Sequence, residues 1–487
     1  MPSLDFEPGI FYLYAVLLKR CFGIIVIASL AGCVRYEPQP LQPEQFDTAF
    51  RARSLIDPNL REFVEKNFAN PPVAWPPAEL DLKSLTLAAL YFHPDLALAR
   101  ARIATAQAGE ITAGVRPNPT ASIMPTWVVN SFPGETPWLF AANLDVPIET
   151  AGKRQRRMDL ARKLTAVARL DFEEAAWSVR ARLRAALVEY FCAQQTLDLF
   201  RAESQLYSQL TNLLEKRIQA GESSRFELAV ARTQSLDAVI ALRAAETRLA
   251  DARLAVATAL GLPASALQSA RLAWPGFAEP ARDVSLDSLQ GAAVLGRLDI
   301  AGALTDYAAA EAALRLEIAK QYPDIHLGPG YEFDQGEHKF SLGPSITLPI
   351  FDRNQGPIAE AKAKREEAAA RFLGVQESAI QDVEKAATDY HYALAEWAEA
   401  GQAARTLQEE IARATERELK LGEADRVASY YVQLQQDAAR RASLDSLRKV
   451  QEAIGALENA VQRPLFDAQD WRAIQGLEDI HSPKGTP

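Results

Sequence analysis

The sequence is poor in the residues from which disulfide frameworks and metal sites are built. Its 487 residues include 3 cysteines and 5 histidines. Three cysteines cannot form a disulfide framework, and five scattered histidines leave little for a metal site. Basic residues are outnumbered, 53 against 63 acidic ones, so the net charge is −10. Because nucleic-acid binding requires an excess of lysine and arginine, this balance argues against a nucleic-acid partner.

Catalytic motifs are lacking as well. The sequence shows no Ser/His/Asp pattern, no glycine-rich phosphate loop and no His/Cys metal spacing, so we predict that the protein is not an enzyme. With 48% hydrophobic and 24% charged residues, it is typical neither of a disordered chain nor of a bundle of membrane-spanning helices. Length alone suggests about three domains.

The N terminus has an apolar run, but a short one. Lys19 and Arg20 precede Phe22–Leu30, which is too short to span a bilayer, since that takes about 20 apolar residues. The pattern predicts an export signal over residues 1–32. Acidic residues stand before the basic pair, where export signals carry positive charge, so we expect translation to begin nearer Leu17.

The end of this run, Leu30-Ala31-Gly32-Cys33, resembles the lipobox of bacterial lipoproteins. The resemblance implies cleavage before Cys33 and attachment of diacylglycerol to its thiol; we expect no other cofactor. The proline-rich segment 33–80 would then be a lipidated tether. The alternative, a membrane anchor from Ile10 to Leu30, would bury two cations at about 2.5–3.5 kcal/mol each.

The rest of the chain contains an internal repeat. His93-Pro94-Asp95-Leu96 corresponds to Arg297-Leu298-Asp299-Ile300, and Val146-Pro147-Ile148 corresponds to Leu348-Pro349-Ile350, each pair about 200 residues apart. The correspondences predict a first repeat over residues 81–285, a second over 286–465 and a C-terminal tail over 466–487. Two tandem units therefore replace the three domains that length suggests.

Each repeat has the same predicted order of elements. A helical stretch (Ser84–Val115; Ala292–Lys320) is followed by two runs in which apolar and polar residues alternate, as in strands with one apolar face. The runs cover 121–129, 140–146, 325–333 and 340–348, with connecting loops at 130–138 and 334–339.

Very long helical stretches follow the strands. Lys153–Ala220 contains no proline and would extend about 100 Å. Arg225–Leu262, Pro357–Leu421 and Arg426–Gln462 have the same character. Helices of this length must pack along one another, as in a coiled coil. A cytoplasmic coiled-coil protein is the simplest alternative, but the strands and the export signal argue against it.

Four strands are too few for a membrane barrel, which begins at about 8. Open strand edges are not tolerated in lipid, so chains would have to pool their strands. Three chains would supply 12, whereas two would supply 8, too narrow for a channel. In a soluble protein, the same hairpins could instead form a small sandwich.

With these features the sequence resembles the TolC-type outer-membrane efflux family over nearly the whole mature chain. The resemblance is carried by the duplication, by Tyr322-Pro323-Asp324 before a strand, by Leu348-Pro349-Ile350-Phe351-Asp352-Arg353-Asn354-Gln355-Gly356 after one, and by Gly221 and Gly422 within the long helices. It implies an α+β fold: a tandem-duplicated protomer with long antiparallel α-helices and four β-strands. Three protomers would form a 12-stranded β-barrel in the outer membrane and an α-helical barrel in the periplasm.

The resemblance also assigns roles to residues. The strand-to-helix junctions would use Gly152, Asn354 and Gly356. The two periplasmic hairpin tips, which in the family meet the adaptor and close the tunnel, would contain Gly221, Glu222, Ser223, Arg225, Glu227, Gly422, Glu423, Asp425 and Arg426. The same residues could equally serve as helix stops and caps. Because Ala428-Ser429-Tyr430-Tyr431 lacks the aspartate of some relatives, a selectivity ring would use Glu227, Glu423 or Asp425.

Three further residue interpretations follow. Lys153–Arg157 is expected to be a solvated first turn near the barrel mouth. Cys192 is expected to pack as a small hydrophobe. His326 and Glu332 are expected to share a polar strand face that lines the lumen.

The implied function is the outer-membrane channel of a tripartite efflux system, which exports substrates from an inner-membrane pump through a periplasmic adaptor. The Ala151-Gly152-Lys153-Arg154 junction and the segment 51–58 look closest to the heavy-metal branch, which serves proton-driven pumps of the RND type. Drug efflux and type I secretion would use the same architecture. The alternative from a different functional class is a periplasmic coiled-coil lipoprotein that only scaffolds other proteins and forms no channel.

Overall fold

The computed structural model describes residues 35–67, 75–129, 134, 136–268, 270–278, 289, 291, 296–421 and 426–465. The predicted export signal, Cys33 and the C-terminal tail lie outside these residues. The chain divides into a small unit, residues 1–50 with 485–487, and a large unit, residues 51–484. In the small unit the described part holds most of helix α2 (Pro43–Ala52), none of whose residues is buried.

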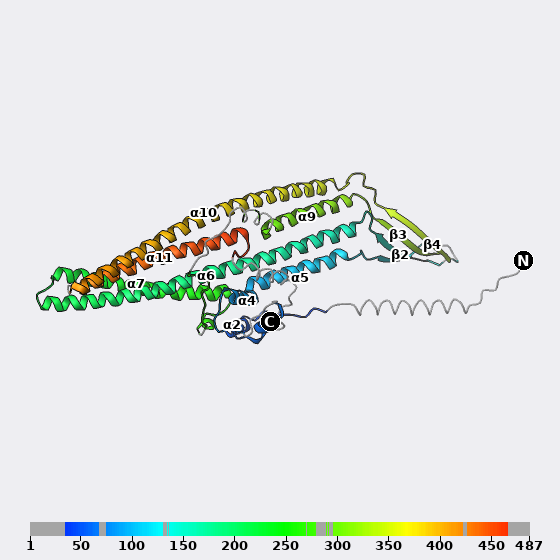
Figure 1. Ribbon diagram of the computed structural model, residues 1–487. Helices are drawn as coiled ribbons and strands as arrows, with labels where there is room; N and C mark the ends of the chain where they lie inside the picture. The colour runs from blue at the N-terminus through cyan, green and yellow to red at the C-terminus, as the bar shows by residue number, and fades with distance from the viewer. Residues whose placement is uncertain are drawn as a thin grey trace. The chain divides into compact units, whose positions relative to one another are not determined.

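The large unit contains one series of elements twice (Figure 1). The first series is α5 (Pro94–Gly114), β1 (Thr120–Trp127), β2 (Trp138–Ile148), α6 (Lys153–Gln219) and α7 (Arg225–Leu260). The second is α9 (Leu298–Ala319), β3 (Ile325–Asp334), β4 (Glu337–Ile346), α10 (Gln355–Leu421) and α11 (Arg426–Val461). Before the first series lie α3 (Pro58–Asn67) and α4 (Leu82–Phe92), and after it η1 (Ala264–Leu267). The predicted α+β class, with long helices and four strands, is confirmed.

One predicted helix is divided. Residues 84–115 were expected to form a single helix, but it is interrupted at His93, which has extended backbone angles (φ −70°, ψ 128°). The cause is Pro94, which disfavours the helical conformation in the residue before it and starts α5 instead. The Nδ1 atom of His93 then accepts a hydrogen bond from the Asp95 backbone N–H (3.2 Å), so the histidine caps the new helix.

The four strands form one antiparallel sheet in the order β1-β2-β3-β4. Ile123 lies opposite Ala142, Ala142 opposite Tyr331, and Tyr331 opposite Phe340. Each of these residues belongs to the apolar set of its strand, so the register gathers all four apolar sets on one face of the sheet.

Both predicted loops have different bounds in the structure, and the second is shorter. Trp138 is the first residue of β2, directly opposite Trp127, and therefore belongs to the sheet. The second hairpin turns through Gln335 and Gly336 alone, whose φ values are 51° and 95°. A two-residue turn of this kind needs positive φ at both positions and matches the twist of the strands, so the ladder extends to Asp334 and Glu337.

The helices continue the order of the strands. α5, α6, α9 and α10 lie side by side in that sequence, α7 packs along α6, and α11 packs along both α6 and α10 (Figure 1). α6 and α10 have 67 residues each. Among the helices that the structure describes, none has a stretch long and apolar enough to cross a bilayer.

The two repeats are joined by a buried polar network between α6 and α11. Glu458 accepts hydrogen bonds from the Arg180 side chain (3.0 Å) and from the Leu465 backbone N–H (3.1 Å). Arg184 donates to the backbone carbonyl of Gln451 (2.8 Å) and to its side-chain oxygen (3.0 Å). Burial lowers the pKa of Arg184, an effect that the nearby Glu458 carboxylate opposes. Both arginines therefore depend on partners in the other repeat.

Cys192 packs as expected. It is a free cysteine, 3% exposed, in the core cluster between α6 and its neighbours. Burial raises the pKa of its thiol to about 12, so it is held as a neutral thiol.

We predict that Glu458→Gln destabilises the helical part. The substitution leaves two buried arginines without their counter-charge, and breaking a buried pair costs roughly 3 kcal/mol. Urea unfolding of the detergent-solubilised protein, followed by circular dichroism at 222 nm, measures the change. Glu452→Gln on the same helix, where the carboxylate is 53% exposed, is the control and should change stability by less than about 0.5 kcal/mol. Equal effects of the two variants would contradict this assignment.

Candidate functional site

The apolar face of the sheet is uncovered within the described chain. No strand residue is buried, and Ile123 is 60%, Leu342 72% and Phe340 82% exposed. The face comprises Ala121, Ile123, Pro125 and Trp127 of β1, Trp138, Phe140, Ala142, Leu144, Val146 and Ile148 of β2, Ile325, Leu327, Pro329, Tyr331 and Phe333 of β3, and His338, Phe340, Leu342, Pro344 and Ile346 of β4. A continuous exposed patch of this kind marks a protein or membrane interaction surface.

Aromatic rings gather at the hairpin end of this face. Trp127 and Trp138 meet edge to face, with ring centroids 4.7 Å apart, and the Tyr331 and Phe340 centroids are 5.3 Å apart. The Tyr331 hydroxyl also lies 2.7 Å from the His338 Nδ1 atom. Aromatic rings with polar groups are typical of the boundary between lipid and water. The sequence analysis missed this band, although the tryptophans that flank the first hairpin loop were its signal.

The opposite face of the sheet is polar. His326 and Glu332 lie on it together, as predicted, and the His326 Nδ1 atom is 3.0 Å from the Asp145 carboxylate. Gly330 leaves room for polar neighbours there, because a Cβ atom at this position would lie 2.5 Å from the Asn143 side-chain oxygen. The sheet thus separates an apolar side from a polar side, as a wall between lipid and water requires.

The predicted junction residues have two different conformations. Gly152 and Asn354 have positive φ values, 68° and 60°, and each directly precedes a long helix. The Asn354 side-chain amide donates to the Glu317 backbone carbonyl (2.7 Å) at the end of α9. Gly356 lies within the first turn of α10, without a positive φ. Of the three predicted junction residues, Gly152 and Asn354 therefore provide special backbone geometry, and Ala151, with φ 55°, does so as well.

The basic segment after Gly152 is not simply a solvated turn, contrary to the prediction. Lys153 is buried and pairs with Asp324 (Nζ to Oδ1, 2.7 Å). Arg154 donates to the Gly114 carbonyl (2.7 Å), and Arg157 donates to the Val115 carbonyl (3.1 Å). The end of α5 has carbonyl groups without helical partners, and these arginines satisfy them.

Asp324 connects the two repeats below the sheet. Its Oδ1 atom accepts hydrogen bonds from Lys153 and from the Thr150 backbone N–H (2.9 Å). Partial burial acts to raise the pKa of Asp324, but the hydrogen bonds from Lys153 and Thr150 outweigh it, and the pKa lies below its usual value. The carboxylate therefore stabilises the junction in its charged form.

The first predicted tip is a tight helical hairpin. Gly221 has φ 78°, and the Glu222 backbone N–H donates to the Arg217 carbonyl (2.8 Å), which closes the end of α6 in a Schellman motif. Ser224, which the sequence analysis did not single out, caps α7 by accepting a hydrogen bond from the Glu227 backbone N–H (3.1 Å). The Ser223 hydroxyl donates to the Glu227 carboxylate (2.7 Å).

The tip presents charged and apolar side chains outward. Glu222 and Arg225 are exposed, and Phe226 is 78% exposed. Of the second tip, Gly422, Glu423 and Asp425 lie outside the described residues, whereas Arg426 is exposed at the first position of α11.

The first tip packs against the start of α11. Leu210 and Leu214 of α6 form a buried cluster with Val427 and Leu434. Burial and then the nearby Glu227 carboxylate raise the pKa of Tyr431, so Glu227 lies close to α11.

Charged residues also cross the helices below the sheet. Arg371 of α10 and Asp306 of α9 are 3.9 Å apart. Burial raises the pKa of Asp171 on α6, an effect that Asp306 increases and Arg102 and Arg371 oppose. Positive and negative side chains are therefore mixed across α5, α6, α9 and α10 at this level. The described residues contain no group of three His, Cys, Asp or Glu side chains that could hold a metal ion.

Comparisons with known proteins agree with this architecture. A model described as outer membrane efflux protein matches residues 87–262 and 289–462. The chain is 25% identical over 292 residues to the cobalt-zinc-cadmium resistance protein CzcC of Cupriavidus metallidurans, a match covering 57% of this chain and 65% of that protein. The chain therefore matches slightly less than two thirds of the length of CzcC.

Two further comparisons extend over more of the chain. The pyoverdine export outer membrane protein OpmQ of Pseudomonas putida is 27% identical over 374 residues, or 70% of this chain and 74% of that protein. The crystal structure of the outer membrane protein VceC from Vibrio cholerae superposes with a TM-score of 0.63 at 21% identity, covering 78% of this chain and 95% of that one. The structural likeness establishes the fold.

We predict that Asp324→Asn weakens the junction in a pH-dependent way. The folded-state pKa is depressed, so the carboxylate stabilises the protein above its usual pKa near 3.8, and this contribution disappears as the pH falls through the lower folded value. At pH 7 the variant should melt at a lower temperature than the wild type, and the difference should shrink as the pH falls below 3.8 and vanish below the depressed folded-state pKa. Asp445→Asn, at a carboxylate that is 67% exposed, is the control. A difference that does not change with pH would contradict the ion pair's role.

Proposed function

We propose that this chain, which belongs to the outer membrane efflux protein family, forms the outer-membrane duct of a tripartite efflux system as a homotrimer. Members of this family are channels of the outer membrane and not enzymes, in agreement with the lack of catalytic motifs in the sequence. The observation that carries the proposal is the sheet with one exposed apolar face and one polar face.

The number of strands supports the trimer. β1 and β4 are the outer strands of the sheet and each has a strand partner on one side only, among the described residues. In lipid, the unpaired backbone groups of such edges must find partners, and only closure provides them. Pairing β4 of one chain with β1 of the next closes 12 strands when three chains assemble, a size that leaves a channel.

The helices extend the duct into the periplasm. α5 and α9 lead into β1 and β3, and α6 and α10 follow β2 and β4, so all four helices adjoin the same end of the sheet. A closed ring of sheets would therefore place three sets of these helices in a ring below it. The hairpin tip around Gly221 lies at the far end of α6, with Glu222, Arg225 and Phe226 directed outward. Charged groups and one exposed aromatic ring suit contact with a periplasmic adaptor protein, which would connect the duct to an inner-membrane pump.

Heavy-metal cations are the substrates that we propose, with a proton-driven pump of the RND type as the energy source. The similarity to CzcC supports this choice. The similarity to OpmQ, which extends over more of the chain, favours export of an organic substrate as the second candidate. Attachment of the mature N terminus to lipid through Cys33, with no other cofactor, completes the proposal.

Reconstitution tests the duct directly. The purified protein, inserted into planar lipid bilayers, should give stepwise ion conductance, and unheated samples should migrate as an oligomer in gel electrophoresis. A periplasmic scaffold would give neither result, so a monomer without conductance would contradict the proposal.

We predict that the triple variant Glu227→Gln, Glu423→Gln, Asp425→Asn weakens cation selectivity and cation block in the same bilayers. Three chains would then lose nine carboxylates from the narrow end of the duct, and a ring of like charges concentrates counter-ions there. Glu246→Gln, on α7 and away from the tip, is the control. Unchanged selectivity and block in the triple variant would exclude a selectivity ring built from these residues.

The substrate requires a cellular test. Deleting the gene should lower the cobalt, zinc and cadmium concentrations that the source cell tolerates, and a plasmid copy should restore them. Unchanged metal tolerance together with increased drug sensitivity would contradict the metal assignment and leave the duct itself intact.

A further inference from the structure

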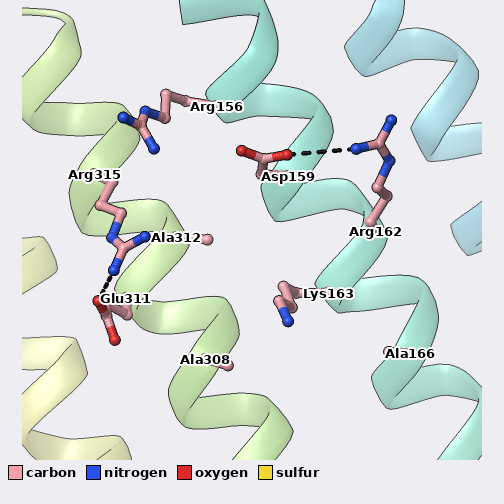
Figure 2. Close-up of a pocket in the computed structure, with 9 residues that line it drawn as sticks. All are labelled: Arg156, Asp159, Arg162, Lys163, Ala166, Ala308, Glu311, Ala312 and Arg315. Carbon is pink, nitrogen blue, oxygen red and sulfur yellow. Dashed lines mark hydrogen bonds and ion pairs between the residues drawn. The ribbon is translucent and has the colours of Figure 1, made fainter.

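A charged groove lies between α6 and α9, just below the junction with the sheet (Figure 2). Its volume is about 460 Å³, and alanines from both helices, Ala166, Ala308 and Ala312, are part of its lining. Six charged side chains line it: Arg156, Asp159, Arg162, Lys163, Glu311 and Arg315. Four are cationic and two anionic, so the groove has a positive balance in a chain whose net charge is −10.

Two of the cations have no partner among the described residues. Arg315 pairs with Glu311, and Arg162 lies 3.5 Å from Asp159. The side chains of Arg156 and Lys163 are exposed and form no hydrogen bond or ion pair within the described chain. Figure 2 shows Arg156 extending from α6 toward α9, near Arg315. Two unpaired cations thus face one groove.

The position of Arg156 is unfavourable for folding alone. α6 begins with Lys153 and has no acidic residue in its first turn. The N-terminal end of a helix carries partial positive charge, and cations placed there are destabilising. Lys153 is compensated by Asp324, but Arg156 gains nothing comparable from the described chain. An anionic ligand would supply the missing compensation.

The groove opens on the side of the apolar sheet face. In a strand of L-residues that runs upward, a residue whose side chain points away from the viewer directs its N–H and C=O groups to the left. When the sheet is viewed from its apolar face with the hairpins uppermost, β1 runs upward and the Val128 side chain points away from the viewer. The Val128 N–H donates to the Pro137 carbonyl (2.8 Å), next to β2, so β2 lies to the left of β1. Asp334 likewise pairs with Glu337 at the closing turn. The strands, and the helices below them, therefore run from β1 on the right to β4 on the left.

Figure 2 shows the helices in this same right-to-left order. The N-terminal end of α6 is uppermost, and α6 lies to the right of α9, so the groove is seen from the apolar side. Arg157, one residue after Arg156, instead extends toward α5 on the right and donates to the Ala113 carbonyl (3.3 Å).

The upper end of the groove, at Arg156, lies at the depth of lipid headgroups. The apolar face ends at Ile148 and Ile325, and α6 begins at Lys153. Arg156 is then about 5 Å below the start of α6 and Lys163 about 15 Å below it. The polar layer on each side of a bilayer is roughly 5–7 Å thick, and a lysine can extend its ammonium group toward it.

We propose that this groove binds the phosphate group of an anionic phospholipid, of the phosphatidylglycerol class, in the periplasmic leaflet. The inference rests on the proposed function, which places the apolar sheet face in the outer membrane. Arg156, Lys163 and Arg315 surround the phosphate, while Asp159 and Glu311 hold the paired arginines in place. Each trimer would carry three such sites and gain an attachment to the leaflet that does not depend on Cys33.

Native mass spectrometry of the detergent-solubilised full chain tests the site. The probes are phosphatidylglycerol, phosphatidylcholine and inorganic phosphate. The wild type should retain phosphatidylglycerol in preference to phosphatidylcholine, whose choline group the cations repel. Arg156→Gln with Lys163→Gln should weaken phosphatidylglycerol binding roughly thirtyfold, since two cations near a lipid surface are removed. Both side chains are unpaired, so the variant should fold normally.

The control variant combines Arg243→Gln and Lys385→Gln, which remove the same charge from exposed positions away from the junction, and it should bind like the wild type. Arg156→Lys with Lys163→Arg should keep the lipid preference. Equal phosphatidylglycerol binding by the wild type and the double glutamine variant would overturn the proposal, as would inorganic phosphate competing as well as the lipid. Conductance of the same preparation separates the claims, because a conducting trimer without lipid preference contradicts only this inference, whereas a preparation without conductance contradicts the proposed function as well.

Discussion

A four-stranded sheet that, within the part of the chain that the structure describes, has two open edges and no buried residue on either face is the constraint on which the rest of the structure depends. In water such a sheet would expose Phe340, Leu342 and the aromatic band near Trp127, and its outer strands would offer unpaired backbone groups. One environment satisfies both conditions, namely a lipid bilayer in which neighbouring copies complete the sheet. The apolar face, the edges and the number of strands therefore lead to the same assembly.

The helices solve a related problem. A helix of 67 residues cannot bury an apolar stripe alone, so α6 packs along α5, α7, α9 and α11, and α10 packs along α9 and α11. The two repeats are held together at three levels. Lys153 and Asp324 connect them at the base of the sheet, Arg180 and Arg184 join Glu458 and Gln451 in the middle, and Leu210 and Leu214 meet Val427 near the tips. Ion pairs thus connect the repeats at the base of the sheet and in the middle of the helices, and apolar contacts connect them near the tips.

Local patterns in the sequence located most of the long helices and strands, although they missed the break at His93. Strict alternation located β3 and β4, and the lack of proline located α6 to within a residue of its end, because side-chain period and proline act within one element. Contacts between distant elements were not predictable in this way. Lys153 was expected in solvent because nothing near it in sequence indicates that Asp324, 171 residues later, lies 2.7 Å away.

In the candidate site, too, local features were predictable from the sequence and contacts between distant elements were not. Gly221 and Asn354 could be found from the sequence, since positive φ favours glycine and asparagine at helix ends. The groove between α6 and α9 could not, because its cations come from two repeats and converge only when the helices pack. Ser224 was overlooked although it is a common capping residue, because Ser223 beside it competes for the same role.

The central claim is that three chains pool their strands in one closed sheet. Native mass spectrometry of the complex extracted in detergent tests this claim most directly, since the mass of an intact assembly counts its chains. The account predicts a single species containing three copies of the mature chain, and hence 12 strands. A complex of one or two copies, with four or eight strands, would contradict it.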